Sequence, residues 1–272
     1  MPSPASTRTA LLIATALLGG AGDSRAAEIT VNDDNTRLVL SGTNQTDAVL
    51  SAGAGNTVEL QAGGTLAGNL LAADAPGAAG FDSLAMAGSH WKISGTAALA
   101  GVTATTLRVA SGTLEVAGGI DAGAGAGATI DAGAALLFTG AGTLAVATII
   151  NNGTLTLSRA GTSYYTQNIT GAGIVVSTAV SWLTGSNTHT GGVRVQGSQL
   201  HVADPSALGT GTVTIASGDL YINRLADALP GDFTFVNPLA GAGRVITRLA
   251  SGTDSFRFAA SAAGAGFNGT FI

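Results

Sequence analysis

A segment that repeats after about 20 residues constrains this chain more than any other feature. Residues 192–202 read GVRVQGSQLHV and residues 212–222 read TVTIASGDLYI, and the two align without a gap. Residues 106–116, TLRVASGTLEV, follow the same template. In each copy two apolar residues alternate with a polar one, a short turn containing Gly and Ser follows, and a second alternating pair ends the unit.

The spacing within one copy predicts a corner. Side chains of a β-strand alternate between its two faces, so Val193 and Leu200 would point to opposite sides of a straight strand. Both point inward only if the chain turns between them, which places a corner at Gln196 to Gln199. The predicted inward residues of the three copies are Val193, Val195, Leu200, Val202, Val213, Ile215, Leu220, Ile222, Leu107, Val109, Leu114 and Val116.

Two architectures accommodate such a unit. In a β-solenoid each unit is one rung, and successive rungs pair in parallel about 4.8 Å apart. In the alternative the turn is a hairpin loop, and the chain forms an antiparallel sandwich or barrel. We favour the solenoid because the regular step along the chain joins two copies of one template. We therefore expect Val193 to lie one rung from Val213, and Leu200 one rung from Leu220.

The composition agrees with closely stacked strands. Gly accounts for 41 of the 272 residues, and charged residues make up only 10%. Asp204-Pro205 predicts a single helical turn, with Asp204 as N-cap and Pro205 at the first position. Residues 69–88, which contain Pro76 and many small residues, are expected to leave the solenoid. At about 20–25 residues a rung, the chain after residue 26 predicts roughly ten to twelve rungs.

Charge and cysteine content exclude several classes of function. The net charge is −5 and there is no basic run with interleaved aromatic residues, so we expect no nucleic-acid partner. The chain has no cysteine, which excludes disulfides, thiol catalysis and cysteine-ligated metals.

The N-terminus, residues 1–26, is predicted to be a secretory signal peptide. Arg8 supplies positive charge, Ala10 to Leu18 form a short apolar region, and Ser24 and Ala26 are the small residues that precede a cleavage site. The apolar region is too short to span a bilayer, which needs about 20 residues. We therefore expect an exported protein that begins near Ala27.

Residues 171–222 resemble the autotransporter-associated β-strand repeat of bacterial type V secretion. The elements that carry the resemblance occur in order along the chain: Gly171 to Ile174, Asn187 to Gly192, Ser198 to Leu200, Ala207 to Gly209 and Gly211 to Ile215. Residues 237–271 also resemble a pattern that recurs in the passenger domains of this family.

The resemblance implies an all-β, right-handed parallel β-helix over residues 27–272, carried to the cell surface by an outer-membrane translocator barrel. We expect no C-terminal barrel in this chain, because the alternating strands and aromatic girdles of such a barrel are not found before Ile272. The expected location is the cell surface, outer membrane or medium for a longer protein, and the periplasm for the chain alone. The apolar segment 266–272 is also expected to promote self-association through the end of the solenoid.

The sequence offers few candidates for chemistry. His90, His189 and His201 lack the spacing of a metal site, and we expect all three to be solvated, His201 on the outward face of its strand. Asp33-Asp34 is the only pair of adjacent carboxylates and is expected to lie in a solvated turn. Residues 118–121, GGID, begin like a calcium-binding β-roll repeat, but residues 122–127 break that pattern. Sequons for N-glycosylation begin at Asn44, Asn152, Asn168 and Asn268, and we interpret them as coincidental.

We therefore expect no catalytic residues, no cofactor and no metal. The favoured hypothesis is a non-catalytic passenger that acts as a structural stalk or adhesin-like module, with a ligand on a host or neighbouring cell. The alternative is a polysaccharide-active β-helix enzyme, which would need a cleft with converging carboxylates and basic residues.

Overall fold

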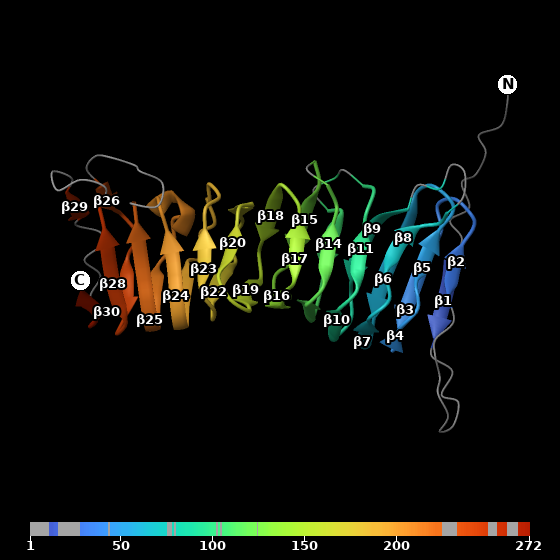
Figure 1. Ribbon diagram of the computed structural model, residues 1–272, viewed down its shortest axis with the longest axis horizontal. Helices are drawn as coiled ribbons and strands as arrows, with labels where there is room; N and C mark the ends of the chain where they lie inside the picture. Colours follow the sequence, from blue (N-terminus) through green and yellow to red (C-terminus); the bar gives the residue numbers. More distant parts are fainter. Residues whose placement is uncertain are drawn as a thin grey trace.

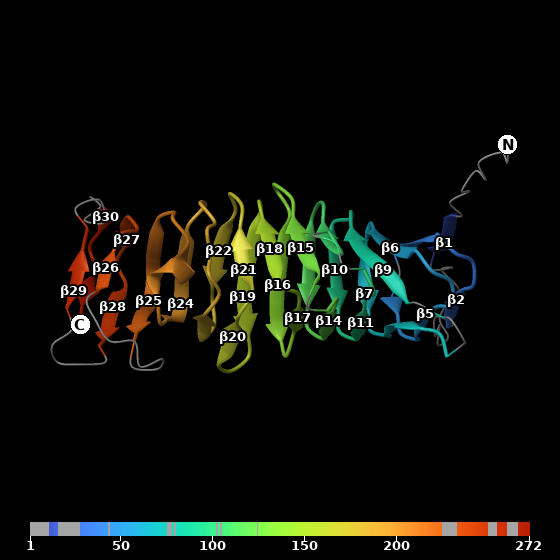
Figure 2. The ribbon, with the colours of Figure 1, turned by 90° about the horizontal axis from the view of Figure 1, so that it is seen from above.

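The chain folds into an elongated stack of parallel strands. The computed structural model describes residues 11–15, 28–42, 44–74, 78, 80–101, 103, 105–123, 125–224, 233–249, 255–259 and 266–272. In both views the strands follow one another along one long axis, with β2 and β30 near opposite ends (Figures 1 and 2). The stack makes about 10 turns, in agreement with the sequence-based expectation of ten to twelve rungs.

Three long sheets form the sides of the stack, and a two-stranded sheet lies beside its last turns. The first sheet contains β1 (Leu11–Thr15), β3 (Arg37–Ser41), β6 (Asn56–Gln61), β9 (Phe81–Met86), β12 (Leu107–Val109), β15 (Gly127–Ile130), β18 (Thr148–Asn151) and β21 (Asn168–Thr170). The second contains β2 (Ile29–Val31), β5 (Val49–Ser51), β8 (Leu70–Ala72), β11 (Thr96–Ala98), β14 (Gly119–Asp121) and β17 (Thr143–Ala145).

The third and largest sheet runs through most of the described chain. It contains β4 (Asn44–Gln45), β7 (Gly63–Leu66), β10 (His90–Ile93), β13 (Thr113–Val116), β16 (Ala135–Gly140), β19 (Thr154–Arg159), β20 (Ser163–Tyr165), β22 (Ile174–Ser177), β23 (Ser181–Leu183), β24 (Val193–Val202), β25 (Val213–Asn223), β27 (Leu239–Gly241), β28 (Arg244–Arg248), β30 (Gly266–Phe267) and β31 (Thr270–Phe271). The two-stranded sheet consists of β26 (Phe233–Phe235) and β29 (Phe256–Phe258).

The register of the two clearest repeat copies confirms the solenoid. Val193 pairs with Val213 and Leu200 with Leu220, both in parallel. Antiparallel hairpins are therefore the wrong alternative for this segment. The step from one rung to the next is not constant, because Ser177 pairs with Val195, whereas Leu66 pairs with Ile93 after a longer stretch of chain.

The predicted corner is present as a bend within β24 and β25. Gly197 has φ 77° and Gly218 has φ 90°, values that L-residues with a side chain rarely adopt. The register of β24 on β25 shifts on either side of Gln196. The bend turns both apolar pairs of each rung inward, and none of the twelve predicted inward residues is more than 1% exposed.

The third repeat copy uses the same template at a different corner of the solenoid. Leu107 and Val109 belong to β12 in the first sheet, whereas Leu114 and Val116 belong to β13 in the third. In the later copies, both apolar pairs belong to the third sheet. The shared template therefore predicts two inward-facing segments with a corner between them. It does not predict which sheets of the stack those two segments belong to.

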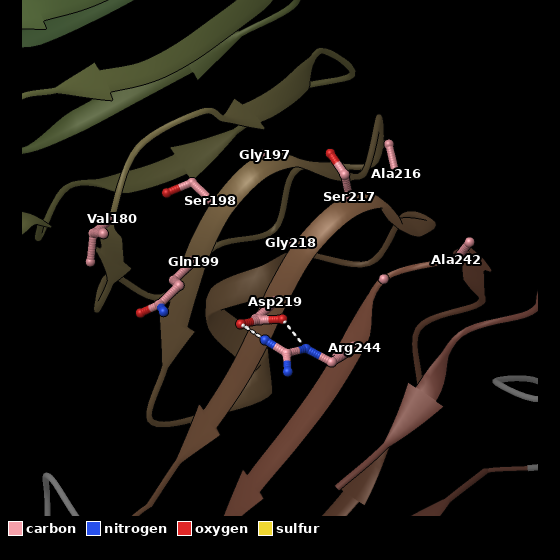
Figure 3. A pocket seen from close by; sticks show the side chains of 11 residues that line it. Val180, Gly197, Ser198, Gln199, Ala216, Ser217, Gly218, Asp219, Ala242 and Arg244 are labelled. Atoms are coloured by element: carbon pink, nitrogen blue, oxygen red, sulfur yellow. Dashed lines mark hydrogen bonds and ion pairs between the residues drawn. The ribbon is translucent and has the colours of Figure 1, made fainter.

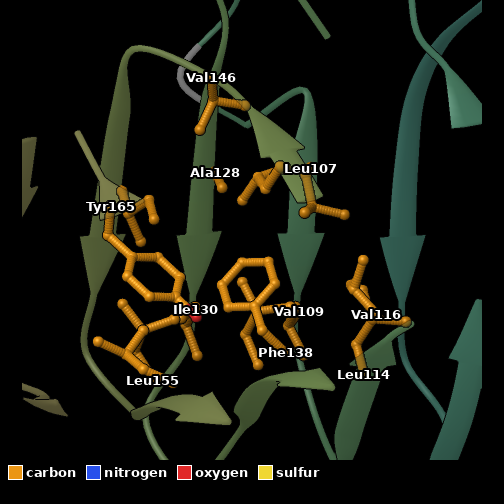
Figure 4. Close-up of a cluster of buried hydrophobic side chains, with 14 of the residues drawn as sticks. Leu107, Val109, Leu114, Val116, Ala128, Ile130, Phe138, Val146, Leu155 and Tyr165 are labelled. Atoms are coloured by element: carbon orange, nitrogen blue, oxygen red, sulfur yellow. The ribbon is translucent and has the colours of Figure 1, made fainter. Parts of the chain in front are cut away.

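Aliphatic and aromatic side chains fill the space between the sheets. Figure 4 shows Leu107, Val109 and Ile130 facing Phe138 and Tyr165 across the interior. The Phe138 and Tyr165 rings lie 5.7 Å apart. Burial raises the pKa of Tyr165 to about 12. Each fully buried aliphatic side chain contributes about 1.5–3 kcal/mol, so stability is distributed along the stack instead of being concentrated at one centre.

The expected excursion at residues 69–88 is largely wrong. Leu70–Ala72 and Phe81–Met86 are the strands β8 and β9, and both pair in parallel with the rungs before them, β9 with one register shift after Asn56. Phe81 and Leu84 are fully buried. Pro76 lies outside the described residues. Glycines and alanines in this segment therefore do not prevent strand formation where they alternate with larger apolar residues.

The single helical turn is confirmed. Pro205–Leu208 form a 3₁₀ helix, η1, and the Asp204 carboxylate accepts a hydrogen bond from the Ser206 N–H at 2.8 Å. Pro205 occupies the start of the helix, where its missing N–H is not needed.

The first strand, β1, comes from the predicted signal peptide. Its residues pair in parallel with β3, from Leu11 opposite Arg37 to Thr15 opposite Ser41. The predicted cleavage site at Ser24 to Ala26 lies outside the described residues. A chain from which residues 1–26 had been removed would lack this strand.

A pair of glycine substitutions tests the tight packing at the corner. A Cβ atom at Gly218 would overlap the carbonyl oxygen of Ser198 on the preceding rung, whereas a Cβ atom at Gly197 would meet nothing within 4 Å. Both positions carry the cost of a positive φ, about 1–2 kcal/mol. We expect Gly218→Ala to lower the free energy of unfolding clearly more than Gly197→Ala, as measured by urea titration and circular dichroism. Equal losses would contradict the one-rung contact.

Candidate functional site: an aromatic ladder and the groove beside it

The three histidines have different environments. The side chain of His90 is 54% exposed and lies 3.6 Å from the Glu115 carboxylate, which agrees with the expected solvated position. His189 has no exposed surface, so the expectation of a solvated side chain is wrong there. His201 does face outward, but it is half-buried between two aromatic rings and is not simply solvated.

The burial of His189 follows from the close stacking of glycine-rich turns. A Cβ atom at Gly209 would overlap the His189 carbonyl oxygen and lie within 2.7 Å of its ring nitrogen Nδ1. The His189 carbonyl also accepts a hydrogen bond from the Thr210 N–H at 2.9 Å. The next rung thus covers the ring. Burial lowers the pKa of His189, which favours the neutral imidazole.

The acidic candidates are engaged in turns. The Asp34 carboxylate accepts a hydrogen bond from the Ala54 N–H at 2.7 Å, and the Asp33 carbonyl accepts one from the Thr36 hydroxyl at 3.2 Å. The Asp121 carboxylate accepts a hydrogen bond from the Gly123 N–H at 3.0 Å. Across the described ranges, no group of three or more His, Asp or Glu side chains is placed to hold a metal ion.

Four aromatic side chains instead form a ladder on the outward face of the third sheet. Tyr164, Trp182, His201 and Tyr221 occupy the same register position on β20, β23, β24 and β25. Their ring centroids are 5.7, 4.6 and 4.5 Å apart in that order, and the angle between adjacent ring planes is 8° to 19°. The parallel register produces the ladder, because it places each ring directly over its neighbour one rung away.

The ladder has two unlike ends. The Tyr164 end is open, with 59% of the residue exposed. At the other end, the Arg248 guanidinium lies over the Tyr221 ring, 5.5 Å from its centroid. Within the ladder the rings stack face to face, and each stacked pair contributes about 0.5–1.5 kcal/mol to the stability of the fold. Only the edges of the inner rings therefore face solvent.

His201 is the one basic side chain of the ladder. Burial lowers its pKa, the nearby Arg248 lowers it further, and Asp219 acts in the opposite direction. One ring nitrogen lies 3.3 Å from the Gln199 carboxamide oxygen. The stack therefore favours the neutral imidazole.

A groove of about 640 Å³ lies beside the ladder, on the outward side of the bends in β24 and β25. Figure 3 shows Gln199, Asp219 and Arg244 along one side of it and small residues across its floor. The lining consists of Val180, Gly197, Ser198, Gln199, Ala216, Ser217, Gly218, Asp219, Ala242, Gly243 and Arg244.

A bidentate ion pair is the strongest polar feature of the groove. The Arg244 guanidinium donates to both oxygens of the Asp219 carboxylate, at 2.7 and 2.8 Å. The Asp219 side chain is only 6% exposed, whereas that of Arg244 is 54% exposed. The carboxylate raises the pKa of Arg244 by hydrogen bonding and charge. The groove thus presents a fixed, electrically balanced pair together with the hydroxyls of Ser198 and Ser217.

Sequence reasoning did not identify the ladder or the groove. Tyr164, Trp182, His201 and Tyr221 follow one another along the chain at nearly equal steps, which match the rung spacing. That spacing is the sequence signal of the ladder. The groove depends on the bend at Gly218 and on register, which no single sequence motif records.

Comparisons with known proteins add no family to this geometry. No protein-family model, curated protein or solved structure matches the chain. No helix within the described ranges is long and apolar enough to cross a membrane.

The ladder predicts a dependence of stability on pH. Because the pKa of His201 is lower in the folded chain than in the unfolded one, its neutral form stabilises the fold above the unfolded value of about 6.5. That stabilisation is lost as the pH falls below about 6.5 and through the folded pKa. We expect His201→Phe, which keeps a ring in the ladder, to retain more of its stability at pH 5 than the parent chain.

The measurement is urea unfolding at several pH values. His189 contributes to the acid sensitivity of both proteins in the same direction. Identical pH profiles for the parent chain and His201→Phe would show that the ladder does not favour the neutral imidazole.

Proposed function

We propose that the chain is the β-helical passenger of an autotransporter, an exported and non-catalytic module that acts as a structural stalk or adhesin-like surface. Residues 1–26 are its signal peptide, and residues 27–272 are the passenger. An outer-membrane translocator is its partner during surface delivery. The proposal rests on two points. Residues 171–222 resemble the autotransporter-associated repeat, and we call the residues that carry this resemblance the signature. The contacts that the signature residues make in the fold are the second point.

The observation that carries the proposal is that signature residues connect adjacent rungs. Asn187 is 4% exposed, and its carboxamide accepts a hydrogen bond from the Ile169 N–H at 2.7 Å and donates one to the Ala207 carbonyl at 2.6 Å. Asn187 thus bridges the rung before it to the rung after it. Asn237, which lies after the signature, also contacts the preceding turn and donates to the carbonyls of Gly209 and Gly211 at 3.0 and 2.9 Å.

The glycines of the signature support the same interpretation. A Cβ atom at Gly191 would overlap backbone atoms of Ala172 and Gly173, and one at Gly211 would overlap backbone atoms of Thr190 and Gly192. The signature residues therefore make contacts between neighbouring rungs. Such contacts lengthen a stack and do not bring catalytic side chains together. A long stack with polar outward residues holds surface features away from its anchor, as a stalk does.

The enzyme alternative receives less support. Asp219 is the only carboxylate in the lining of the groove, and Arg244 engages both of its oxygens. Glycoside hydrolysis commonly uses two carboxylates on either side of the bond that is cleaved.

Export provides the test. The full chain is expressed in a Gram-negative host, and the N-terminus of the periplasmic protein is determined by mass spectrometry. We expect it at Ala27 or within a few residues of it. Ala26→Phe should block cleavage, because the position before the cut requires a small residue, whereas the control Ala27→Phe should still be processed. A soluble protein that keeps Met1 and stays in the cytoplasm would refute the proposed signal peptide.

A further inference from the structure

The groove beside the ladder follows the long axis of the solenoid. Its lining comes from successive rungs: Val180 precedes β23, residues 197–199 belong to β24, residues 216–219 to β25, and residues 242–244 lead from β27 into β28. With about 4.8 Å per rung, these four levels span roughly 14 Å. A ligand that fits such a groove is linear and repeats along its length.

Close stacking of neighbouring rungs fixes the backbone at the floor of the groove. A Cβ atom at Gly243 would overlap the side chain of Ile215 and the Gly218 carbonyl, and Gly218 is equally confined by Ser198. A larger residue at either position is therefore sterically excluded. The concavity is a consequence of how the rungs stack, so it exists before any ligand arrives and need not be formed on binding.

One wall of the groove carries planar polar groups in register. Gln199 pairs with Asp219 across one rung, and Asp219 pairs with Arg244 across the next. Arg244 uses two nitrogens on Asp219, and each carboxylate oxygen retains a second lone pair. The row thus consists of the carboxamide of Gln199, the carboxylate of Asp219 and the guanidinium of Arg244. These groups can hydrogen-bond to pairs of neighbouring hydroxyl groups, because a hydroxyl group both donates and accepts.

The charge balance argues against other polymers. Asp219 compensates the charge of Arg244, so the wall does not attract a polyanion such as a nucleic acid or a sulfated polysaccharide. An extended peptide is disfavoured as well, because β24 and β25 are inner strands whose backbone groups bond to their neighbours, which leaves no free edge for strand addition.

We propose that this groove binds a neutral, linear oligosaccharide along the solenoid axis, with its hydroxyl groups on Gln199, Asp219 and Arg244. Tyr164, at the open end of the ladder, provides an exposed ring on the same face of the third sheet against which a sugar can stack. This inference rests on the proposed function and deepens it, since it names the chemical class of ligand that an adhesin-like module recognises.

The test is binding of purified protein to maltohexaose, cellohexaose, xylohexaose and mannohexaose, with heparin and polygalacturonate as anionic probes, by isothermal titration calorimetry. We expect at least one neutral hexasaccharide to bind in the micromolar to millimolar range. Gln199→Ala should weaken binding on the order of fivefold or more, a loss of about 1 kcal/mol. Ser217→Trp, at an exposed position, should fill the groove and abolish binding.

Matched controls separate local from general effects. Thr30→Trp places the same bulk at an exposed position of the second sheet and should bind like the parent chain. Asp131→Asn disrupts a more exposed arginine–carboxylate pair with Arg108 on the first-sheet side and should leave binding unchanged, whereas Asp219→Asn should weaken it. Circular dichroism confirms that each variant is folded.

Three outcomes would overturn the inference: no neutral hexasaccharide binds at millimolar concentration, binding survives Ser217→Trp, or only the anionic probes bind. None of these depends on export. A failed signal peptide with intact binding would therefore reject the proposed function alone, and normal processing without binding would reject this inference alone.

Discussion

The structure depends on one constraint, the in-register parallel pairing of each rung with the next. Because adjacent rungs are about 4.8 Å apart, every residue meets the residue at the equivalent position of its neighbours. An apolar residue such as Leu200 therefore stacks on Leu220, and the ring of His201 on that of Tyr221. The core, the aromatic ladder and the ion pairs are all consequences of this single geometric rule.

The same constraint explains the glycines and the buried asparagines. Where the chain turns, neighbouring backbones approach so closely that a Cβ atom at Gly211 or Gly218 would overlap the next rung. Where the sheets give way to turns, carbonyl and N–H groups lose their strand partners. Asn187 pairs with an N–H group on one neighbouring rung and a carbonyl on the other, and Asn237 donates to two carbonyls of the preceding turn, so these buried backbone groups keep partners.

Much of the fold could be predicted from local pattern. The alternation around Val193 and Leu200 specified both the corner and the inward face, and Asp204-Pro205 specified η1, because these features depend on neighbouring residues alone. The buried position of His189 could not be predicted, since it results from the rung that covers it. The candidate site was harder to predict for the same reason, because Gln199, Asp219 and Arg244 are brought into one row only by register. The excursion expected at residues 69–88 is wrong over β9, because the small residues there lie beside the alternating pair Leu84 and Met86, which are both fully buried.

Disulfide trapping in the naturally cysteine-free chain tests the central claim most directly. Arg194 pairs with Thr214, and Thr214 pairs with Ala240 one rung further on. Adjacent in-register positions lie within the range of Cα separations that a disulfide bridges, about 4.4–6.8 Å, and positions two rungs apart do not. The solenoid predicts that Arg194→Cys with Thr214→Cys oxidises readily and that Arg194→Cys with Ala240→Cys does not. Efficient bridging of Arg194→Cys with His201→Cys, as in a hairpin closed at Gly197, would contradict it.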